Sequence, residues 1–348
     1  MPDAIATDAV IVGAGPVGLY MAFQLGLQDI RCHIVDALPH AGGQCLELYA
    51  DKPIYDIPGV PYTTGRGLID SLLQQVRPFQ PALHLQQTIV SVHRAADDGL
   101  ELASSSGQRF RTRTLFIAAG VGAFEPKRLA LPEAENFLNT QLFYAVPPAA
   151  ALAGKQLLII GDSEAALQAA LAAAEDGSAA SVTLLHRRAV FSATPATQQA
   201  FQALVQAGRI RFLAAQATAL VHAHGSLQAL RVADGAGVEH SVPTDVLLVL
   251  QGLSPKLGAI AHWGLAMERR QLQVDTETFA TSETGIFAVG DINTYPGKKK
   301  LIACGFHECI LAAFAAAALL HPERKILLQY TTTSTHLHAL LGVENPQR

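Results

Sequence analysis

The chain has 348 residues, of which 50% are hydrophobic and 16% charged, with a formal net charge of −4. At roughly 100–200 residues per domain this length predicts two domains, and the apolar composition excludes a disordered chain. The acidic balance argues against a basic nucleic-acid-binding protein. The longest apolar run, 310–320, is about half of the ~20 residues that a membrane span needs, and the N-terminus lacks a secretory leader. We therefore expect a cytoplasmic protein with neither nucleic acid nor membrane as a partner.

The chain opens with the elements of a dinucleotide-binding βαβ unit. A buried strand at 8–13 ends in glycine, a helix follows at 19–27, and a second buried strand spans 32–36. Between the first strand and the helix the sequence is Gly13-Ala-Gly15-Pro16-Val-Gly18, which has the G-x-G-x-x-G spacing. These glycines predict a tight turn that lies close to a pyrophosphate, at the positive end of the helix dipole.

Asp36 ends the second strand, eighteen residues after Gly18. A carboxylate at this place accepts hydrogen bonds from ribose hydroxyls and disfavours a 2′-phosphate. The unit therefore suits FAD or NAD better than NADP. The alternative is a glycine turn that packs for structural reasons alone.

Two further buried strands predict how the chain is divided. The strands at 113–120 and 245–252 both end in glycine, and we interpret them as the two passages between domains. The predicted fold is α/β, with one domain inserted into the other and boundaries near residues 125 and 251. Turn residues between apolar runs predict hairpin loops at 99–107 and 234–237.

The inserted domain carries a second βαβ candidate with a less regular turn. A buried strand at 156–161 leads into Gly161-Asp-Ser163-Glu-Ala-Ala166, where serine and alanine replace the second and third glycines. Alanine is an accepted variant at the third position, but serine keeps the backbone farther from a phosphate. The carboxylates of Asp162 and Glu164 would weaken pyrophosphate binding unless they point away.

Two arginines stand where the first unit has its acid. After a helix at 165–175 and a strand at 181–185, the chain continues His186-Arg187-Arg188. Arginine at this strand end is typical of 2′-phosphate recognition. Each charged hydrogen bond contributes roughly 1.5–3 kcal/mol, so the pair would favour NADPH over NADH by about 10²- to 10⁴-fold. The alternative is a solvated basic strand end.

Near the end of the chain, a buried strand at 285–291 closes on Asp291, and a helix follows at 302–320. Four strings stand out: GGQCLELYADKPIYDIPG at 42–59, GVGAFEP at 120–126, AVGD at 288–291 and YTTTST at 330–335. With these strings the chain resembles the two-dinucleotide-binding flavoprotein family that contains thioredoxin reductase, and most closely its ferredoxin–NADP⁺ reductase branch. The resemblance implies two Rossmann-like domains, each built from three layers in the order β, β, α. The NADP(H)-binding domain, 125–250, is then inserted into an FAD-binding domain formed by 1–124 and 251–348.

The resemblance also implies which residues contact the two nucleotides. FAD contacts fall on Gly13, Gly15, Pro16, Gly18, Asp36, Gln44, Tyr49, Ile89, Phe124, Asp291 and Thr332. NADP contacts fall on Gly161, Ser163, Ala166, Arg187 and Arg188. Tyr49 would stack on the isoalloxazine, although a half-buried core tyrosine is the alternative. Thr332 or Thr333 would cover the other face of the flavin, that of the partner subunit in a homodimer.

The activity that the resemblance implies is electron transfer between NADPH and ferredoxin or flavodoxin, with hydride transfer to or from flavin N5. Beyond the flavin this chemistry requires no catalytic side chain and no metal. The run Lys298-Lys-Lys300 could meet an acidic carrier through complementary charge, or it could be a solvated loop.

Two other functions stay open. The irregular second turn is compatible with an FAD-binding redox sensor, or a complex partner, in which NADPH turnover is weakened. A disulfide reductase that uses an external thiol is the other alternative. It is disfavoured because the four cysteines contain no C-x-x-C pair.

Overall fold

The computed structural model describes residues 4–343, apart from the side chain of Phe124. The chain forms two compact units: Met1–Ala123 together with Pro255–Arg348, and Phe124–Ser254. The boundaries expected from the sequence lie one and four residues from these. The connecting segments β11 (Ala123–Pro126) and β19 (Leu253–Lys256) pair as a two-stranded sheet.

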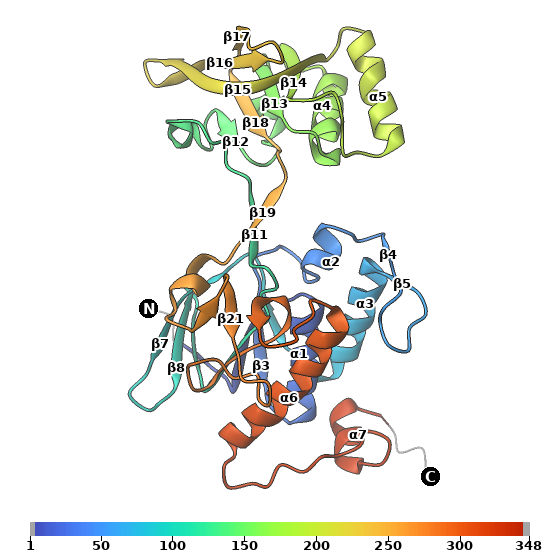
Figure 1. The fold of residues 1–348 in the computed structure, drawn as a ribbon, viewed down its shortest axis with the longest axis vertical. Helices are drawn as coiled ribbons and strands as arrows, with labels where there is room; N and C mark the ends of the chain where they lie inside the picture. Colours follow the sequence, from blue (N-terminus) through green and yellow to red (C-terminus); the bar gives the residue numbers. More distant parts are fainter. Residues whose placement is uncertain (1–3, 344–348) are drawn as a thin grey trace. The chain divides into compact units, whose positions relative to one another are not determined.

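A five-stranded parallel sheet is the centre of the first unit (Figure 1). Its strands, in spatial order, are β22 (Ile286–Ala288), β10 (Thr114–Ile117), β2 (Ala9–Val12), β3 (Cys32–Val35) and β6 (Ala82–His84). Helices α1 (Pro16–Leu27), α3 (Gly65–Val76) and α6 (Ile302–Leu320) pack against one face. A second sheet packs against the other face, with the order β1 (Ile5–Ala6), β9 (Arg109–Thr112), β8 (Leu100–Ser104) and β7 (Ile89–Arg94).

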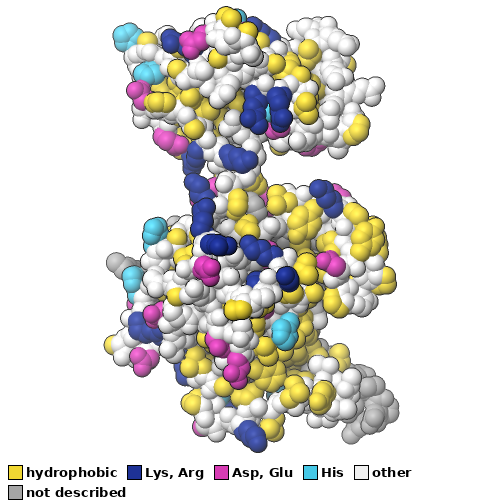
Figure 2. All heavy atoms as spheres, viewed as in Figure 1, with side chains coloured by type: hydrophobic (Ala, Val, Ile, Leu, Met, Phe, Trp, Pro, Cys, Tyr) yellow, Lys and Arg dark blue, Asp and Glu magenta, His cyan; other side chains and the backbone are white. Residues whose placement is uncertain are grey.

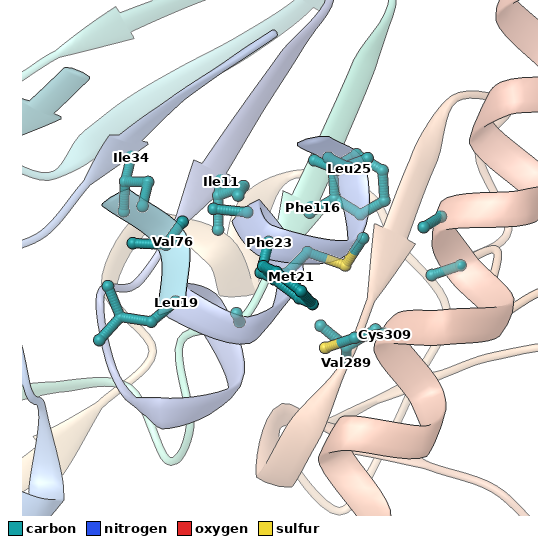
Figure 3. Close-up of a cluster of buried hydrophobic side chains, with 14 of the residues drawn as sticks. Ile11, Leu19, Met21, Phe23, Leu25, Ile34, Val76, Phe116, Val289 and Cys309 are labelled. Carbon is teal, nitrogen blue, oxygen red and sulfur yellow. The ribbon is translucent and has the colours of Figure 1, made fainter. Parts of the chain in front are cut away.

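The strands of the parallel sheet are apolar on both faces because both faces are covered. Along β2, Ile11 belongs to the core under the helices, whereas Val10 belongs to the core under the second sheet. Figure 3 shows the helical side, where Ile11, Ile34 and Phe116 from three strands meet side chains of α1. The predicted strands at 8–13, 32–36 and 113–120 are confirmed by β2, β3 and β10.

Small residues let α6 pack closely against the start of α1. A Cβ built on Gly305 would lie 2.5 Å from a methyl group of Val17. The predicted helix at 302–320 is confirmed by α6. By length and composition alone α6 could cross a membrane, but one face, including Cys309 and Ala316, is buried in the core of the first unit.

The second unit has one seven-stranded sheet. Its order is β12 (Leu142–Phe143), β18 (Val246–Val249), β13 (Gln156–Ile160), β14 (Ser181–His186), β15 (Arg211–Ala223), β16 (Ser226–Asp234) and β17 (Glu239–Pro243). Neighbouring strands from β12 to β15 are parallel, and β15, β16 and β17 are antiparallel. The long strand β15 belongs to both parts and shifts register twice after Ala217. Helices α4 (Glu164–Asp176) and α5 (Pro195–Gln206) cover one face.

Shorter elements complete the chain. They are α2 (Gln44–Glu47), β4 (Pro53–Ile54), β5 (Thr63–Thr64), β20 (Met267–Glu268), β21 (Gln271–Gln273), β23 (Asn293–Thr294) and α7 (Thr335–Leu341), together with five short 3₁₀ turns in residues 4–343. The predicted loop at 99–107 was wrong, because Leu100–Ser104 is the strand β8. Leu100 and Leu102 alternate with more exposed positions there, a period-two pattern that the flanking glycines and serines obscured.

His33 of β3 and His84 of β6 form a close pair beside Phe110. Their rings stack 5.1 Å apart, and Nδ1 of His33 lies 2.8 Å from Nε2 of His84. This hydrogen bond needs one unprotonated nitrogen. Burial lowers the pKa of both rings, and the neighbouring His84 lowers the pKa of His33 further.

We expect this histidine pair to lower the stability of the folded protein in acid. Below about pH 6.5 the unfolded histidines take up protons that the folded pair resists, so the free energy of unfolding falls as the pH drops from 7 toward 5. Replacing both residues (His33→Gln/His84→Gln) should reduce that slope in urea denaturation of the apoprotein. Equal slopes for the two proteins would contradict the prediction.

Candidate functional site

Four strand ends of the first unit converge at one edge of its sheet. The glycine turn follows β2, Asp36 follows β3, Gly120 follows β10, and Gly290–Asp291 follows β22. Because these strands are parallel neighbours, their carboxyl ends share an edge, where α/β proteins bind nucleotides. The structure thus brings together sequence-predicted residues that lie more than 250 positions apart, Gly13 and Asp291 among them.

The glycine turn is closed on one side and open on the other. Gly13 has φ +109°, and a Cβ there would lie 2.4 Å from the carbonyl oxygen of Ala118. A Cβ on Gly18 would lie 1.9 Å from the carbonyl oxygen of Gly13. A Cβ on Gly15 would have no neighbouring atom within 4 Å. The two packed glycines hold the turn against the sheet, and the open side at Gly15 leaves space for a ligand.

The first turn of α1 is suited to bind phosphate. Gly15 is its N-cap residue, so no side chain caps the helix, and Pro16 occupies the first turn. The backbone N–H groups of a helix start have no partners within the helix, and the dipole is positive there. An open cradle beside uncapped N–H groups fits a pyrophosphate.

Asp36 is fixed next to this turn by two backbone groups. The N–H of Ala14 donates to its Oδ2 at 2.5 Å, and the N–H of Leu38 donates to its Oδ1 at 2.8 Å. Burial raises the pKa of the carboxyl, which the two N–H groups and His40 oppose. Dinucleotide-binding βαβ units carry an acid at this strand end, where it can accept hydrogen bonds from ribose hydroxyls.

The segment after Gly42 returns to the glycine turn. The N–H of Gly42 donates to the carbonyl of Ala14 at 2.8 Å, and a Cβ on Gly43 would lie 3.1 Å from the Cα of Gly15. A Cβ on Gly120 would lie 3.0 Å from the side-chain amide nitrogen of Gln44. The structure therefore places Gln44 beside the glycine turn and Gly120.

Tyr49 is half-buried, and its hydroxyl accepts a hydrogen bond from the Cys45 thiol at 3.5 Å. Burial raises the pKa of Tyr49, and the bond to Cys45 and the negative charge of Asp291 add to the effect. Burial likewise raises the pKa of Asp291, and Lys298 and Lys300 oppose it. Tyr49 and Asp291 therefore belong to one electrostatic environment.

A buried ion pair holds the backbone next to Asp291. Glu308, the single acid of α6, is fully buried and forms a salt bridge with Lys298, whose side chain is 7% exposed. The N–H of Gly290 donates to Glu308 at 2.6 Å, and the side-chain amide of Asn293 donates to it at 2.8 Å. Lys298 also donates to the carbonyl of Gly290 at 2.9 Å.

The sequence reasoning missed this cluster. One available signal was Glu308, the single acid in the mostly apolar 302–320 stretch, because a buried acid requires a partner. Lys298 was assigned to a basic run at 298–300, but only Lys299 and Lys300 are exposed.

The remaining predicted residues differ in where they lie. Ile89 is buried at the start of β7, two residues after Gln87, whose N–H donates to the carbonyl of Asp36 at 3.0 Å. Phe124 has its backbone in β11, and its side chain lies outside the described part of the chain. Thr332 and Thr333 are exposed just before α7. Because α7 lies at the end of the first unit opposite α2 (Figure 1), one chain does not bring these threonines to its own glycine turn.

The second glycine turn lies between β13 and α4. A Cβ on Gly161 would lie 2.3 Å from the carbonyl oxygen of Leu250 and 2.9 Å from the Cβ of Ala166. Ser163 caps α4 by accepting a hydrogen bond from the N–H of Ala166 at 3.4 Å. Gly161 is therefore packed as closely as Gly13 in the first turn. The start of α4 differs from that of α1, because the Ser163 side chain caps it.

The Glu164 carboxylate is held by residues at the start of α5. It accepts hydrogen bonds from the N–H of Thr194 at 2.7 Å and the hydroxyl of Thr197 at 2.6 Å. These bonds lower the pKa of Glu164. The second acid, Asp162, lies 3.8 Å from His186. Both carboxylates therefore have partners within the second unit, and Glu164 stays ionised.

Arg187 and Arg188 are exposed directly after β14. Within residues 4–343, neither guanidinium makes a hydrogen bond or an ion pair. The turn itself is held by Nδ1 of His186, which lies 2.9 Å from the carbonyl oxygen of Arg188. Two unpaired cations at this strand end are positioned to bind an anionic group.

All four cysteines lie in the described part of the chain and are free thiols. Burial raises the pKa of Cys32 to about 12 and raises those of Cys45 and Cys309. Redox-active thiols have lowered pKa values. These three cysteines are therefore unsuited to thiol–disulfide exchange at neutral pH.

Known proteins resemble this chain over nearly its full length. The model of the pyridine nucleotide-disulphide oxidoreductase family matches residues 7–308. A ferredoxin–NADP reductase from Polaromonas is 54% identical over 344 residues, covering 98% of this chain and 94% of the relative. Another from Albidiferax ferrireducens is 54% identical over 346 residues, covering 99% and 98%.

Solved structures confirm the α/β fold with two Rossmann-like units. A thioredoxin reductase from Gloeobacter violaceus has a TM-score of 0.56 at 20% identity, covering 94% of this chain and 98% of that one. A bacillithiol disulfide reductase from Staphylococcus aureus has a TM-score of 0.58 at 16% identity, covering 92% and 100%. At such identities these likenesses carry the fold alone.

Two glycine substitutions distinguish an effect on ligand binding from an effect on the stability of the fold. Gly15→Ala adds a methyl group on the open side and replaces a favoured N-cap residue, so we expect the free energy of unfolding to fall by no more than about 1 kcal/mol, while FAD binds at least about tenfold more weakly. Gly18→Ala should destabilise the apoprotein itself, because its Cβ would collide with Gly13. Urea denaturation and FAD titration measure the two effects. Unchanged FAD affinity in Gly15→Ala would place the pyrophosphate elsewhere.

The ion pair predicts an unusual order of stabilities. Lys298→Met leaves the Glu308 carboxylate buried without its cation, which costs about 3–5 kcal/mol. Lys298→Met/Glu308→Gln removes both charges and keeps an acceptor for the N–H of Gly290. The double variant should therefore be more stable than the single variant in urea denaturation. A double variant that is less stable than Lys298→Met would contradict the cost assigned to the lone carboxylate.

Proposed function

Because this chain belongs to the pyridine nucleotide-disulphide oxidoreductase family, we propose that it is an FAD-dependent enzyme that transfers electrons between NADPH and a one-electron carrier, ferredoxin or flavodoxin. The chain is an oxidoreductase, as its 54% identical relatives are. The observation that carries the proposal for FAD is the open cradle at Gly15 beside the fixed carboxylate of Asp36.

The residues around this cradle would each contact a different part of FAD. The glycine turn and the start of α1 would bind the pyrophosphate, and Asp36 would bind the adenosine ribose. Gln44 and Asp291 would lie along the cofactor, and Tyr49 would stack on the isoalloxazine. Ile89 would provide a backbone contact near the adenine. Bound FAD supplies the redox chemistry, exchanging a hydride with NADPH at N5 and single electrons with the carrier.

The second unit would bind NADPH. Gly161, Ser163 and Ala166 would lie along its pyrophosphate, and Arg187 and Arg188 would clamp its 2′-phosphate. The hydrogen bonds from Thr194 and Thr197 to Glu164 support this assignment, since they hold its carboxylate against the start of α5.

A second copy of the chain would complete the flavin site. The threonines before α7 are exposed, and so are the neighbouring apolar side chains Leu327, Leu328 and Tyr330. We propose a homodimer in which Thr332 or Thr333 of one chain covers the flavin of the other. Exposed apolar side chains at a segment that its own unit leaves uncovered favour such a contact.

The two alternative functions have less support. Use as a disulfide reductase would depend on an external thiol, because the chain has no C-x-x-C pair and burial raises the pKa of Cys32, Cys45 and Cys309. The redox-sensor alternative depends on Asp162 and Glu164 repelling the phosphate, and Glu164 is bonded elsewhere. Asp162→Gly/Ser163→Gly distinguishes the redox sensor from the NADPH-dependent enzyme: a large gain in NADPH affinity would support a decayed site, and no gain would support a working one.

The arginine pair predicts the nucleotide preference. Arg187→Ala/Arg188→Ala should reduce the NADPH-to-NADH ratio of kcat/KM for carrier reduction by about 10²- to 10⁴-fold. Arg211→Ala/Arg231→Ala, which removes the same charge from exposed positions of β15 and β16, should leave it unchanged. An unchanged ratio in the first variant would refute the assignment. A wild-type protein that reduces neither ferredoxin nor flavodoxin with NADPH would refute the proposed function.

A further inference from the structure

The first unit has a basic hollow that the nucleotide site does not use. It lies beside the turn between β20 and β21 and has a volume of about 400 Å³. Three cationic side chains line it, those of Lys256, Arg269 and Arg270, and Leu257 and Met267 add apolar surface. A hollow of this size with several cations is suited to an anionic group.

The two arginines occupy a turn that rarely contains them. Arg269 has φ +47° and Arg270 has φ +69°. A two-residue hairpin turn with both residues in the left-handed region favours Asn-Gly, because larger side chains are strained there. Backbone strain of this kind is typical of functional sites. Two consecutive arginines in these positions place two guanidinium groups at the tip of the hairpin.

These guanidinium groups are not used to hold the fold. Both residues are exposed, and within the described part of the chain neither side chain forms a hydrogen bond or an ion pair. Glu268 is the single acid in the hairpin. The whole chain has a net charge of −4, so this local positive surface opposes the overall sign and would attract an acidic partner.

The turn is connected directly to the Asp291 backbone. Gln271, the next residue, donates from its side-chain amide to the carbonyls of Asp291 at 3.2 Å and Asn293 at 2.7 Å. Strand β21 also pairs in parallel with β23. Lys299 and Lys300 follow on the same chain segment and are exposed. Figure 2, drawn in the orientation of Figure 1, shows Lys and Arg side chains gathered on the part of the first unit around β21.

We propose that the Arg269–Arg270 turn is the docking site for the acidic electron carrier. The inference rests on the proposed function, because it supplies that activity with its protein partner. Carboxylates on the carrier would enter the hollow and pair with the two guanidinium groups, whose fork geometry suits carboxylate. Charge complementarity and the connection to Asp291 favour a protein that must approach the flavin over a free small anion.

The decisive variant is Arg269→Asn/Arg270→Gly. It keeps the two-residue turn and installs the residues that such a turn favours, so the melting temperature should stay equal or rise. Calorimetric titration at low salt, with purified ferredoxin and with flavodoxin, should show at least about tenfold weaker binding of the accepted carrier. The affinity should also depend less on salt. FAD affinity and NADPH reduction of the bound flavin should not change.

A matched control removes two cations elsewhere. Arg211→Asn/Arg231→Asn should bind the carrier like the wild type, since its charges come from exposed positions of the second unit. Wild-type affinity in the turn variant, or no binding of either carrier by the wild type, would overturn the docking site. Turn-dependent binding of inorganic phosphate with unchanged carrier affinity would overturn it in favour of a small-anion site. Carrier that binds at the turn without being reduced would refute the proposed function and not the surface.

Discussion

The close packing of backbone at the carboxyl edge of the first sheet is the constraint on which the site depends. The carbonyl groups of Ala118 and Gly13 leave no room for a Cβ on Gly13 or Gly18. Helix α1 can therefore start directly at the strand end, with its uncapped first turn beside the Asp36 carboxylate. The open side of Gly15 is a consequence of this packing, because neighbours hold the turn from the other side only.

The same constraint extends to the far end of the chain. Val17, in the first turn of α1, contacts the points where Gly290 and Gly305 would carry a Cβ. These contacts fix α6 and the turn before Asp291 against α1. Glu308 then orients the Gly290 N–H from within α6. Burying its charge is unfavourable alone, and the bonds from Lys298, Asn293 and Tyr295 offset that cost. Both halves of the first unit thus converge on one binding edge.

Short-range patterns predicted much of this arrangement. The glycine turn and Asp36 could be read from spacing, because strand, turn and helix follow one another within 30 residues. The Glu308–Lys298 pair could not, since Lys298 sits in a run of three lysines that looks solvated. The strained Arg269–Arg270 turn was also missed, because a turn with two left-handed residues favours Asn and Gly, and arginine gives no such signal. The orientation of Glu164 likewise depends on Thr194 and Thr197, thirty residues away.

The proposed function requires that one unit hold FAD and that the other deliver the electrons of NADPH to it. The most direct test is an anaerobic titration of the purified protein with NADPH and then NADH, following the absorbance of the oxidised flavin. We expect bound FAD, rapid bleaching by NADPH and slow bleaching by NADH. Bound FAD that neither nucleotide reduces would contradict it, and would mean that the turn at Gly161–Ala166 no longer supports electron transfer.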